Sequence, residues 1–164
     1  MIPNSIVQYL MENHVPFKRY WHARAVSAQA LAHKLHVTGY RVAKSVIVEA
    51  DDTTWIAVLP ASEMLDEEMF ARAVGADGAS LLPEARFAKL FPDCELGAEP
   101  PFGGLYGLGV VFDEVLVGEE QLVFRAGSHE ETLEIRADDF LALESPVTAP
   151  IGRRIAQLHR AHAS

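Results

Sequence analysis

Lys44 is the residue whose type and position most clearly invite chemistry. The stretch from Val42 to Ala50 is rich in β-branched residues, which predicts a strand, and the alternation of such a strand puts Lys44 on the same face as Val42, Val46 and Val48. A charge on an apolar face is costly to bury. A lysine held there inside a pocket could neutralise a phosphate or a developing oxyanion. The alternative is that Lys44 extends from the strand end into water or protects a sheet edge.

A second candidate is the loop from Gly97 to Gly104, which reads Gly-Ala-Glu-Pro-Pro-Phe-Gly-Gly. Its prolines restrict the path of the chain, and its glycines let the backbone approach a ligand closely. Backbone amides held in this way can bind a carbonyl oxygen or an oxyanion. Surface turns use the same residues, so the pattern alone leaves both interpretations open. The glycines at 107 and 109 precede a predicted strand, unlike those of a dinucleotide-binding fingerprint.

Two histidine-containing segments are weaker candidates. Gly127, Ser128 and His129 follow a predicted strand and place a hydroxyl and an imidazole at a turn, but a serine nucleophile also needs a base and an orienting acid in a defined geometry. His33 and His36 are three residues apart and could share a helix face. With one cysteine and no second ligand cluster, the sequence favours a solvated histidine pair over a metal site.

Helices and strands alternate along the chain without repeats, which predicts an α+β or mixed α/β domain with a curled sheet. The expected helices cover residues 3–13, 27–38, 67–74, 83–90 and 137–143. The expected strands cover residues 17–21, 42–50, 54–60, 109–117, 121–127 and 131–136, with a hairpin at Asp51 and Asp52 and a turn at Gly118. Residues 92–109 are expected to form a loop long enough for a functional role.

Length and composition predict one domain over residues 1–164. The chain has 164 residues, of which 49% are hydrophobic and 23% charged, as in ordinary globular proteins. This composition excludes collagen-like, disordered and disulfide-rich classes of protein. The only cysteine, Cys94, fits a reducing compartment. No apolar run approaches the ~18 residues of a membrane span, and the N-terminus lacks a secretory pattern, so we expect a soluble, cytoplasmic protein.

Charge is distributed unevenly along the chain. The formal net charge is −9, which argues against nonspecific nucleic-acid binding. Residues 13–48 nevertheless hold six basic residues and no acidic one, whereas residues 49–144 hold five basic and 22 acidic residues. The tail from Ser145 onward adds three arginines. The basic segments could form one face that meets a phosphate backbone, or could be dispersed over a surface of mixed charge.

The ordered set of these motifs resembles the YbaK/ProX family, the free-standing relatives of the editing insertion of bacterial prolyl-tRNA synthetase. The resemblance runs from about residue 4 to residue 144. The segments that carry it are Tyr20-x-His22, the helix from Val26-Ser27-Ala28 to Leu35-His36-Val37, Val42-Ala43-Lys44-Ser45, Gly97-x-x-x-Pro101-Phe102-Gly103 and Gly127-Ser128-His129. The sequence departs from the family at Ser27, where threonine is frequent. It also lacks the acidic residue that usually follows this position in the family.

The resemblance implies a curled, barrel-like mixed sheet surrounded by helices, and a trans-acting hydrolase of mischarged aminoacyl-tRNA. It implies that Lys44 holds the terminal phosphate and ribose, that the backbone of Gly97 to Pro101 positions the aminoacyl carbonyl, and that a ribose hydroxyl helps to activate water without metal or cofactor. His129 would lie beside the amino-acid pocket. The remaining substrate-binding positions implied are Tyr20, His22, Ser45, Phe102, Gly103, Gly127 and Ser128.

The expected substrate is a small amino acid, with alanine first and cysteine as another choice, on a tRNA that we expect to be tRNA-Pro. A cognate synthetase is a possible partner. Two other functions stay open at this point. One is a noncatalytic module of the same family that binds a nucleotide end or a protein, and the other is hydrolysis of a small acyl ester that does not involve tRNA.

Overall fold

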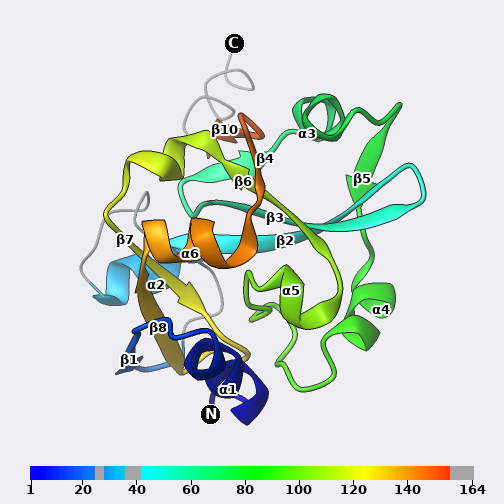
Figure 1. Ribbon diagram of the computed structural model, residues 1–164. Helices are drawn as coiled ribbons and strands as arrows, with labels where there is room; N and C mark the ends of the chain where they lie inside the picture. The colour runs from blue at the N-terminus through cyan, green and yellow to red at the C-terminus, as the bar shows by residue number, and fades with distance from the viewer. Residues whose placement is uncertain (25–27, 36–41, 156–164) are drawn as a thin grey trace.

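The computed structural model describes residues 1–24, 28–35 and 42–155 and contains helices, strands and short 3-10 segments (Figure 1). The helices in these ranges are α1 (Asn4–Glu12), α2 (Ala28–Leu35), α3 (Glu67–Val74), α4 (Glu84–Phe87), α5 (Gly103–Tyr106) and α6 (Ala137–Glu144), with 3-10 segments η1 (Ala88–Leu90) and η2 (Glu114–Gly118). The strands are β1 (Lys18–Trp21), β2 (Ala43–Ala50), β3 (Thr53–Pro60), β4 (Glu63–Leu65), β5 (Ala79–Leu81), β6 (Gly109–Asp113), β7 (Gln121–Arg125), β8 (Glu131–Arg136), β9 (Val147–Ala149) and β10 (Gly152–Arg154).

The strands form three sheets. The largest has the order β5-β2-β3-β6-β9 and is mixed, because β3 and β6 pair in parallel, as do β6 and β9, while β2 is antiparallel to both of its neighbours. A second sheet has the order β1-β8-β7, and a third pairs β10 with β4. One parallel bridge between Val42 and Val123 links the first two sheets. The predicted α+β class is confirmed, although the sheets do not close into a barrel.

The predicted hairpin of β2 and β3 is confirmed and forms the middle of the large sheet. Its two-residue turn requires Asp51 to adopt a positive φ of 52°, which aspartate tolerates better than most residues. The Asp51 carboxylate also accepts the N–H groups of Asp77 (3.3 Å) and Gly78 (3.4 Å). The turn is therefore tied to the segment that leads into β5.

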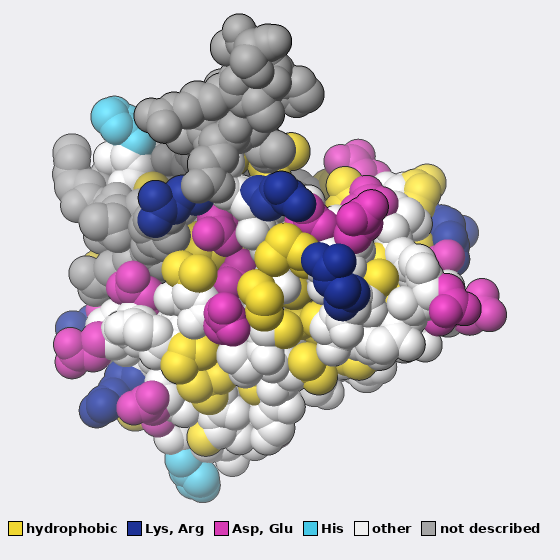
Figure 2. Space-filling view, turned by 90° about the horizontal axis from the view of Figure 1, so that it is seen from above, with side chains coloured by type: hydrophobic (Ala, Val, Ile, Leu, Met, Phe, Trp, Pro, Cys, Tyr) yellow, Lys and Arg dark blue, Asp and Glu magenta, His cyan; other side chains and the backbone are white. Residues whose placement is uncertain are grey.

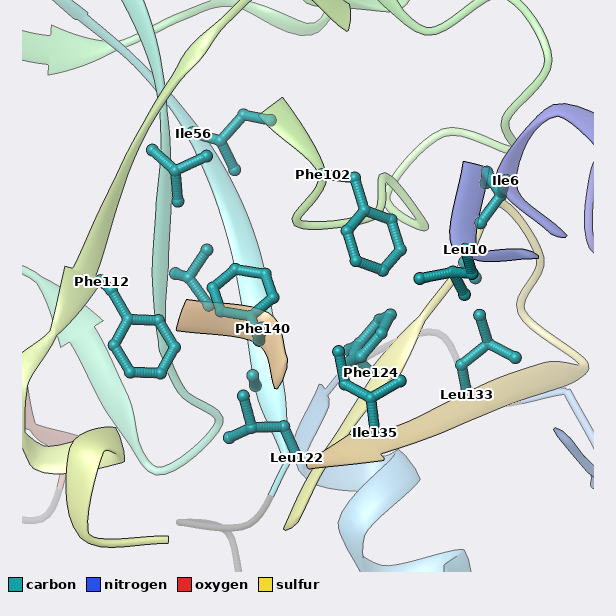
Figure 3. Packing of buried hydrophobic residues seen from close by; sticks show 14 of the residues in the cluster. Ile6, Leu10, Ile56, Phe102, Phe112, Leu122, Phe124, Leu133, Ile135 and Phe140 are labelled. Carbon is teal, nitrogen blue, oxygen red and sulfur yellow. The ribbon is translucent and has the colours of Figure 1, made fainter. Parts of the chain in front are cut away.

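Apolar side chains cover both faces of this sheet, so its central strands read as continuous hydrophobic runs. On one face, α1 packs Ile6 and Leu10 against a cluster that contains Phe102 and Phe124 (Figure 3). On the other face, α3 contributes the fully buried Phe70. A third cluster joins Leu31 of α2 to Val42 and Val123, where the two larger sheets meet.

Helix and strand boundaries agree with the sequence analysis for the longer elements, in which the hydrophobic periodicity extends over several residues. The carboxylate of Asp66 accepts the N–H of Met69 (2.9 Å) and caps α3, as its position before the helix predicts. The segment after Pro83 forms α4 followed by η1. The predicted roles of Ser27, Val37 and Gly39 at the ends of α2 lie outside the described residues. No helix in the described ranges is both long and apolar enough to cross a membrane.

Two predictions about local structure are wrong. Residues 114–117 were expected to extend a strand, but Asp113 accepts the N–H of Val115 (3.1 Å) and starts η2 instead. Consequently β6 and β7 belong to different sheets and do not form a hairpin around Gly118. The expected loop over 92–109 also contains the short helix α5. The strands β4, β5, β9 and β10 were not predicted, because three residues are too few to display an alternation.

Candidate functional site

A small cavity lies where the start of β2 meets the loop after η1 and the end of β7. Its volume is about 30 Å³, enough for a water-sized group. The residues that line it are Leu31, Ala43, Lys44, Ser45, Gly97, Glu99 and Arg125. The fold therefore brings Lys44, Ser45 and Gly97, three of the residues singled out in the sequence, to one concavity.

The edge of β2 also turns backbone groups toward this cavity. The C=O of Val42 accepts the N–H of Ala61 (2.9 Å), so the even-numbered residues of β2 bond to β3. The odd-numbered residues present their N–H and C=O groups to the opposite edge, where Ile47 accepts the N–H of Leu82 (2.9 Å). β7 reaches this edge at the bridge between Val42 and Val123, and Leu82 reaches it at Ile47. Ser45 lies between them, where no strand in the described ranges pairs with it, so its peptide groups can bond to a ligand.

Lys44 is half-buried on the cavity wall. Burial lowers the pKa of its ammonium, and the nearby carboxyl of Glu63 opposes this shift. The charge of Lys44 therefore lies on an apolar strand face, as predicted, since Val48 on the same face is fully buried. An ammonium with little water around it gains more from an anionic ligand than an exposed one does.

The Gly97 loop is held by its own hydrogen bonds. Gly97 has a φ of 85°, a value that favours glycine, and its N–H donates to Oε1 of Glu99 (3.0 Å). The N–H of Ala98 donates to the C=O of Glu95 (3.0 Å), and the C=O of Ala98 accepts the N–H of Gly127 (2.7 Å). The amide of Gly97 can bind an aminoacyl carbonyl, as the family resemblance implies, only if the Glu99 carboxylate releases it.

Glu99 and Arg125 are cavity residues that the sequence analysis did not select. They are 7% and 8% exposed. Burial raises the pKa of the Glu99 carboxyl, while burial lowers the pKa of Arg125 and the neighbouring Glu99 charge opposes that shift. A charged residue in the apolar run of β7 and an acid in a proline-rich loop were signals that could have found them.

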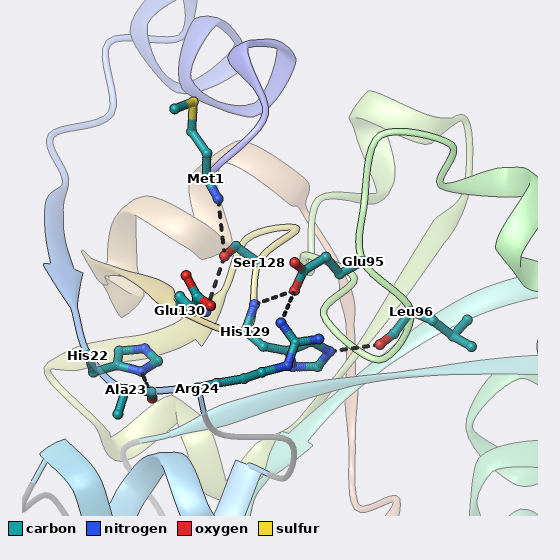
Figure 4. Close-up of polar contacts among 9 residues, drawn as sticks. All are labelled: Met1, His22, Ala23, Arg24, Glu95, Leu96, Ser128, His129 and Glu130. Atoms are coloured by element: carbon teal, nitrogen blue, oxygen red, sulfur yellow. Dashed lines mark hydrogen bonds and ion pairs between the residues drawn. The ribbon is translucent and has the colours of Figure 1, made fainter.

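His129 packs against the loop that contains Gly97 and bonds to Leu96 in it, but His129 does not line the cavity (Figure 4). Its Nε2 donates to the C=O of Leu96 (2.7 Å), which leaves Nδ1 as a buried acceptor without a hydrogen-bond partner in the described part of the chain. Its backbone N–H donates to Glu95 (2.9 Å), and this bond is the main cause of the lowered pKa of the Glu95 carboxyl. A Cβ on Gly97 would lie 3.5 Å from the imidazole.

Gly127 and Ser128 anchor the turn to the N-terminus. Gly127 has a φ of 86°, and a Cβ there would lie 2.6 Å from Pro3. The hydroxyl of Ser128 accepts the N-terminal ammonium of Met1 (3.3 Å) and the N–H of Glu130 (3.1 Å) (Figure 4). Ser128 is 1% exposed.

Five other predicted site residues lie outside the cavity lining. Tyr20 donates its hydroxyl to Glu134 (3.0 Å), and Nδ1 of His22 bonds to the C=O of Ala23 (2.8 Å). Pro101, Phe102 and Gly103 are buried, and the Phe102 ring meets Phe124 edge-on with centroids 5.2 Å apart. These three residues therefore shape the loop from the core side.

The basic segments do not form a continuous unpaired face among the described residues. Arg19 pairs with the buried Glu131 (3.2 Å), and Arg24 pairs with Glu95 (3.4 Å). In the tail, Arg153 pairs with Asp66. On the face shown in Figure 2, basic and acidic side chains are interspersed.

A buried pair of carboxyl groups, Glu63 and Asp113, lies near Lys44. They are 5% and 1% exposed, and a Cβ on Gly152 would lie 2.6 Å from Glu63 and 3.2 Å from Asp113. Burial and the neighbouring Asp113 raise the pKa of Glu63 to about 7. Glu63 is therefore mostly protonated in the folded protein below neutral pH.

Glu63→Gln is expected to stabilise the protein at about pH 8 but not at about pH 5. The raised pKa of about 7 means that folding favours protonated Glu63, a contribution that is lost as the pH rises through that value. Glutamine keeps the neutral state, so the gain at the higher pH should be roughly 1–3 kcal/mol. Urea unfolding of both proteins at the two pH values measures it. The exposed Glu130→Gln is the control, and an equal gain at both pH values would contradict the raised pKa of Glu63.

Comparisons with known proteins identify the family of this chain. Residues 22–143 match the aminoacyl-tRNA editing domain. The chain belongs to this family, which confirms the resemblance to YbaK/ProX proteins. No curated protein matches the sequence.

Solved structures share the fold. A proposed trans-editing enzyme for prolyl-tRNA synthetase has a TM-score of 0.79 and 18% identity, over 92% of this chain and 96% of that one. A scaffold used for computational epitope grafting has a TM-score of 0.78 and 21% identity, over 93% and 97%. A proposed signal-transduction protein from Marinobacter aquaeolei has a TM-score of 0.73 and 19% identity, over 96% of this chain but 32% of that one.

Proposed function

We propose that this chain is a trans-acting deacylase, working as a single domain in the cytoplasm, that hydrolyses the ester between a small amino acid and the terminal adenosine of a tRNA. The cavity shared by Lys44 and Gly97 carries the proposal. It combines a partly desolvated cation, the uncovered edge of β2 at Ser45 and a volume suited to a small group. Family membership supports the same chemistry.

In this reaction Lys44 holds the phosphate or ribose oxygen next to the ester, and its positive charge stabilises the negative charge that develops on the carbonyl oxygen. The peptide groups of Ser45 orient the bound end, and a ribose hydroxyl orients the attacking water. His129 keeps Leu96 and therefore Gly97 in place. Water adds to the ester carbon, the bond to the ribose oxygen breaks, and the amino acid and the free tRNA leave.

We propose alanine as the amino acid, as expected from the family resemblance. A hydrophobic pocket distinguishes side chains by only ~1–3 kcal/mol per methylene, so neighbouring small amino acids should react at lower rates. We expect alanyl-tRNA-Pro to react fastest, and a cognate synthetase to be a candidate partner in substrate delivery.

A deacylation panel tests the proposed function. Alanyl, cysteinyl, seryl and 2-aminobutyryl esters on tRNA-Pro and tRNA-Ala are incubated with the wild-type protein, and the released amino acid is followed over time. The expected result is release well above spontaneous hydrolysis, fastest for alanine. Release from none of the esters would contradict the proposal, and binding of tRNA without turnover would favour a noncatalytic member of the family.

A further inference from the structure

The proposed hydrolysis needs a group that accepts a proton from the attacking water. A ribose hydroxyl can orient the water, but a neutral hydroxyl is a very weak base. The proton must therefore pass to a stronger base within hydrogen-bond reach of the water. That base should lie on the wall of the cavity beside the bound ester, where the water sits.

Glu99 is the only carboxylate among the described residues that line the cavity. The Arg125 guanidinium stays protonated and so cannot act as a base. Lys44 is needed in its charged form to bind the ester. Ser45 offers only a hydroxyl. The acceptor with the right chemistry is thus the Glu99 side chain.

The Glu99 carboxylate is held in a fixed position with capacity left for a water molecule. Its Oε1 accepts the N–H of Gly97 (3.0 Å), and the N–H of Glu99 itself also bonds to the carboxylate. An ionised carboxylate offers about four acceptor sites, so two amide bonds leave room for another donor. The cavity of about 30 Å³ exceeds the minimum space for one water.

We propose that the cavity between Lys44, Glu99 and Arg125 is the seat of the hydrolytic water and that Glu99 is its general base. This inference rests on the proposed deacylase function. Glu99 takes one proton from the water while the oxygen bonds to the ester carbon. When the bond from that carbon to the ribose oxygen breaks, Glu99 returns the proton to the ribose oxygen. The amino acid and the tRNA hydroxyl are the products, and Glu99 is ionised again.

The surrounding charges suit this role. Burial raises the pKa of Glu99, which makes it a stronger base than an exposed glutamate. Glu84 of α4 acts in the same direction, and the imidazole of His129 acts against it. Lys44 and Arg125 provide positive charge for the negative transition state.

The test compares Glu99→Gln with the wild type under single-turnover conditions across a range of pH. Glutamine keeps an oxygen for the N–H of Gly97 but cannot accept the proton. The expected result is a rate lower by roughly 100-fold or more. The wild-type rate should rise with pH to a plateau as Glu99 ionises, at a pH above the ordinary pKa of a glutamate, and this rise should be absent in the variant.

Glu120→Gln is the matched control, because Glu120 is exposed and lies outside the cavity lining. Its plateau rate should stay within about threefold of the wild type. Glu99→Asp should recover part of the pH-dependent rate. If the wild type is active and Glu99→Gln keeps both its rate and its pH rise, Glu99 is not the base, while the deacylase function stands. If the wild type hydrolyses no ester, both proposals fail.

Discussion

Lys44→Ala is expected to reduce ester hydrolysis by roughly 100- to 1,000-fold while leaving the fold intact. The Lys44 ammonium is the cavity cation whose pKa burial lowers, so it is poorly solvated before substrate binds. Its contribution to a negative transition state is correspondingly large. The rate of amino-acid release under single-turnover conditions measures the effect.

Lys44→Met separates charge from packing. Methionine retains an apolar stem of similar length but carries no charge, so it should lose as much activity as alanine does. The exposed Lys89→Ala should keep the wild-type rate. Near-normal turnover by Lys44→Met would assign Lys44 a packing role and remove it from the proposed chemistry.

Phe102→Ala is expected to lower the free energy of unfolding by about 3–5 kcal/mol. Phe102 is completely buried, and its ring contacts Phe124, Phe140 and Tyr9 with centroids 5.2, 6.3 and 5.7 Å away. The substitution leaves a void at the centre of this aromatic cluster. Urea unfolding followed by circular dichroism measures the loss.

Phe102→Leu distinguishes a core residue from a substrate-binding one. Leucine fills much of the space, so the loss of stability should be smaller, and the KM of the remaining folded protein should match the wild type. A KM raised about tenfold or more without loss of stability would return Phe102 to the substrate site that the family resemblance implies.

The sequence was most informative where a local pattern of residues determines the structure. The alternation in β2 predicted both the strand and the unusual position of Lys44, and the aspartates at 51 and 52 predicted the hairpin. The parallel pairing of β3 with β6 could not be foreseen, because it joins segments separated by two short strands and the helices α3, α4 and α5.

The site was only partly predictable, because its geometry depends on contacts between distant segments. Ser128 bonds to the N-terminus, and His129 holds Leu96 through its imidazole. Neither contact is visible in a local pattern, so the sequence could not show that these residues tie distant segments together. Glu99 and Arg125 were overlooked for the same reason, since only the fold brings them to Lys44.

The most direct test of the account is nitrogen NMR of the Lys44 side chain during titration with adenosine that carries alanine through a stable amide. Occupancy of the cavity predicts a saturable shift of the Lys44 signal and of the Gly97 amide, with the Lys89 signal unchanged. Saturable binding that shifts other signals and leaves Lys44 and Gly97 unmoved would contradict it.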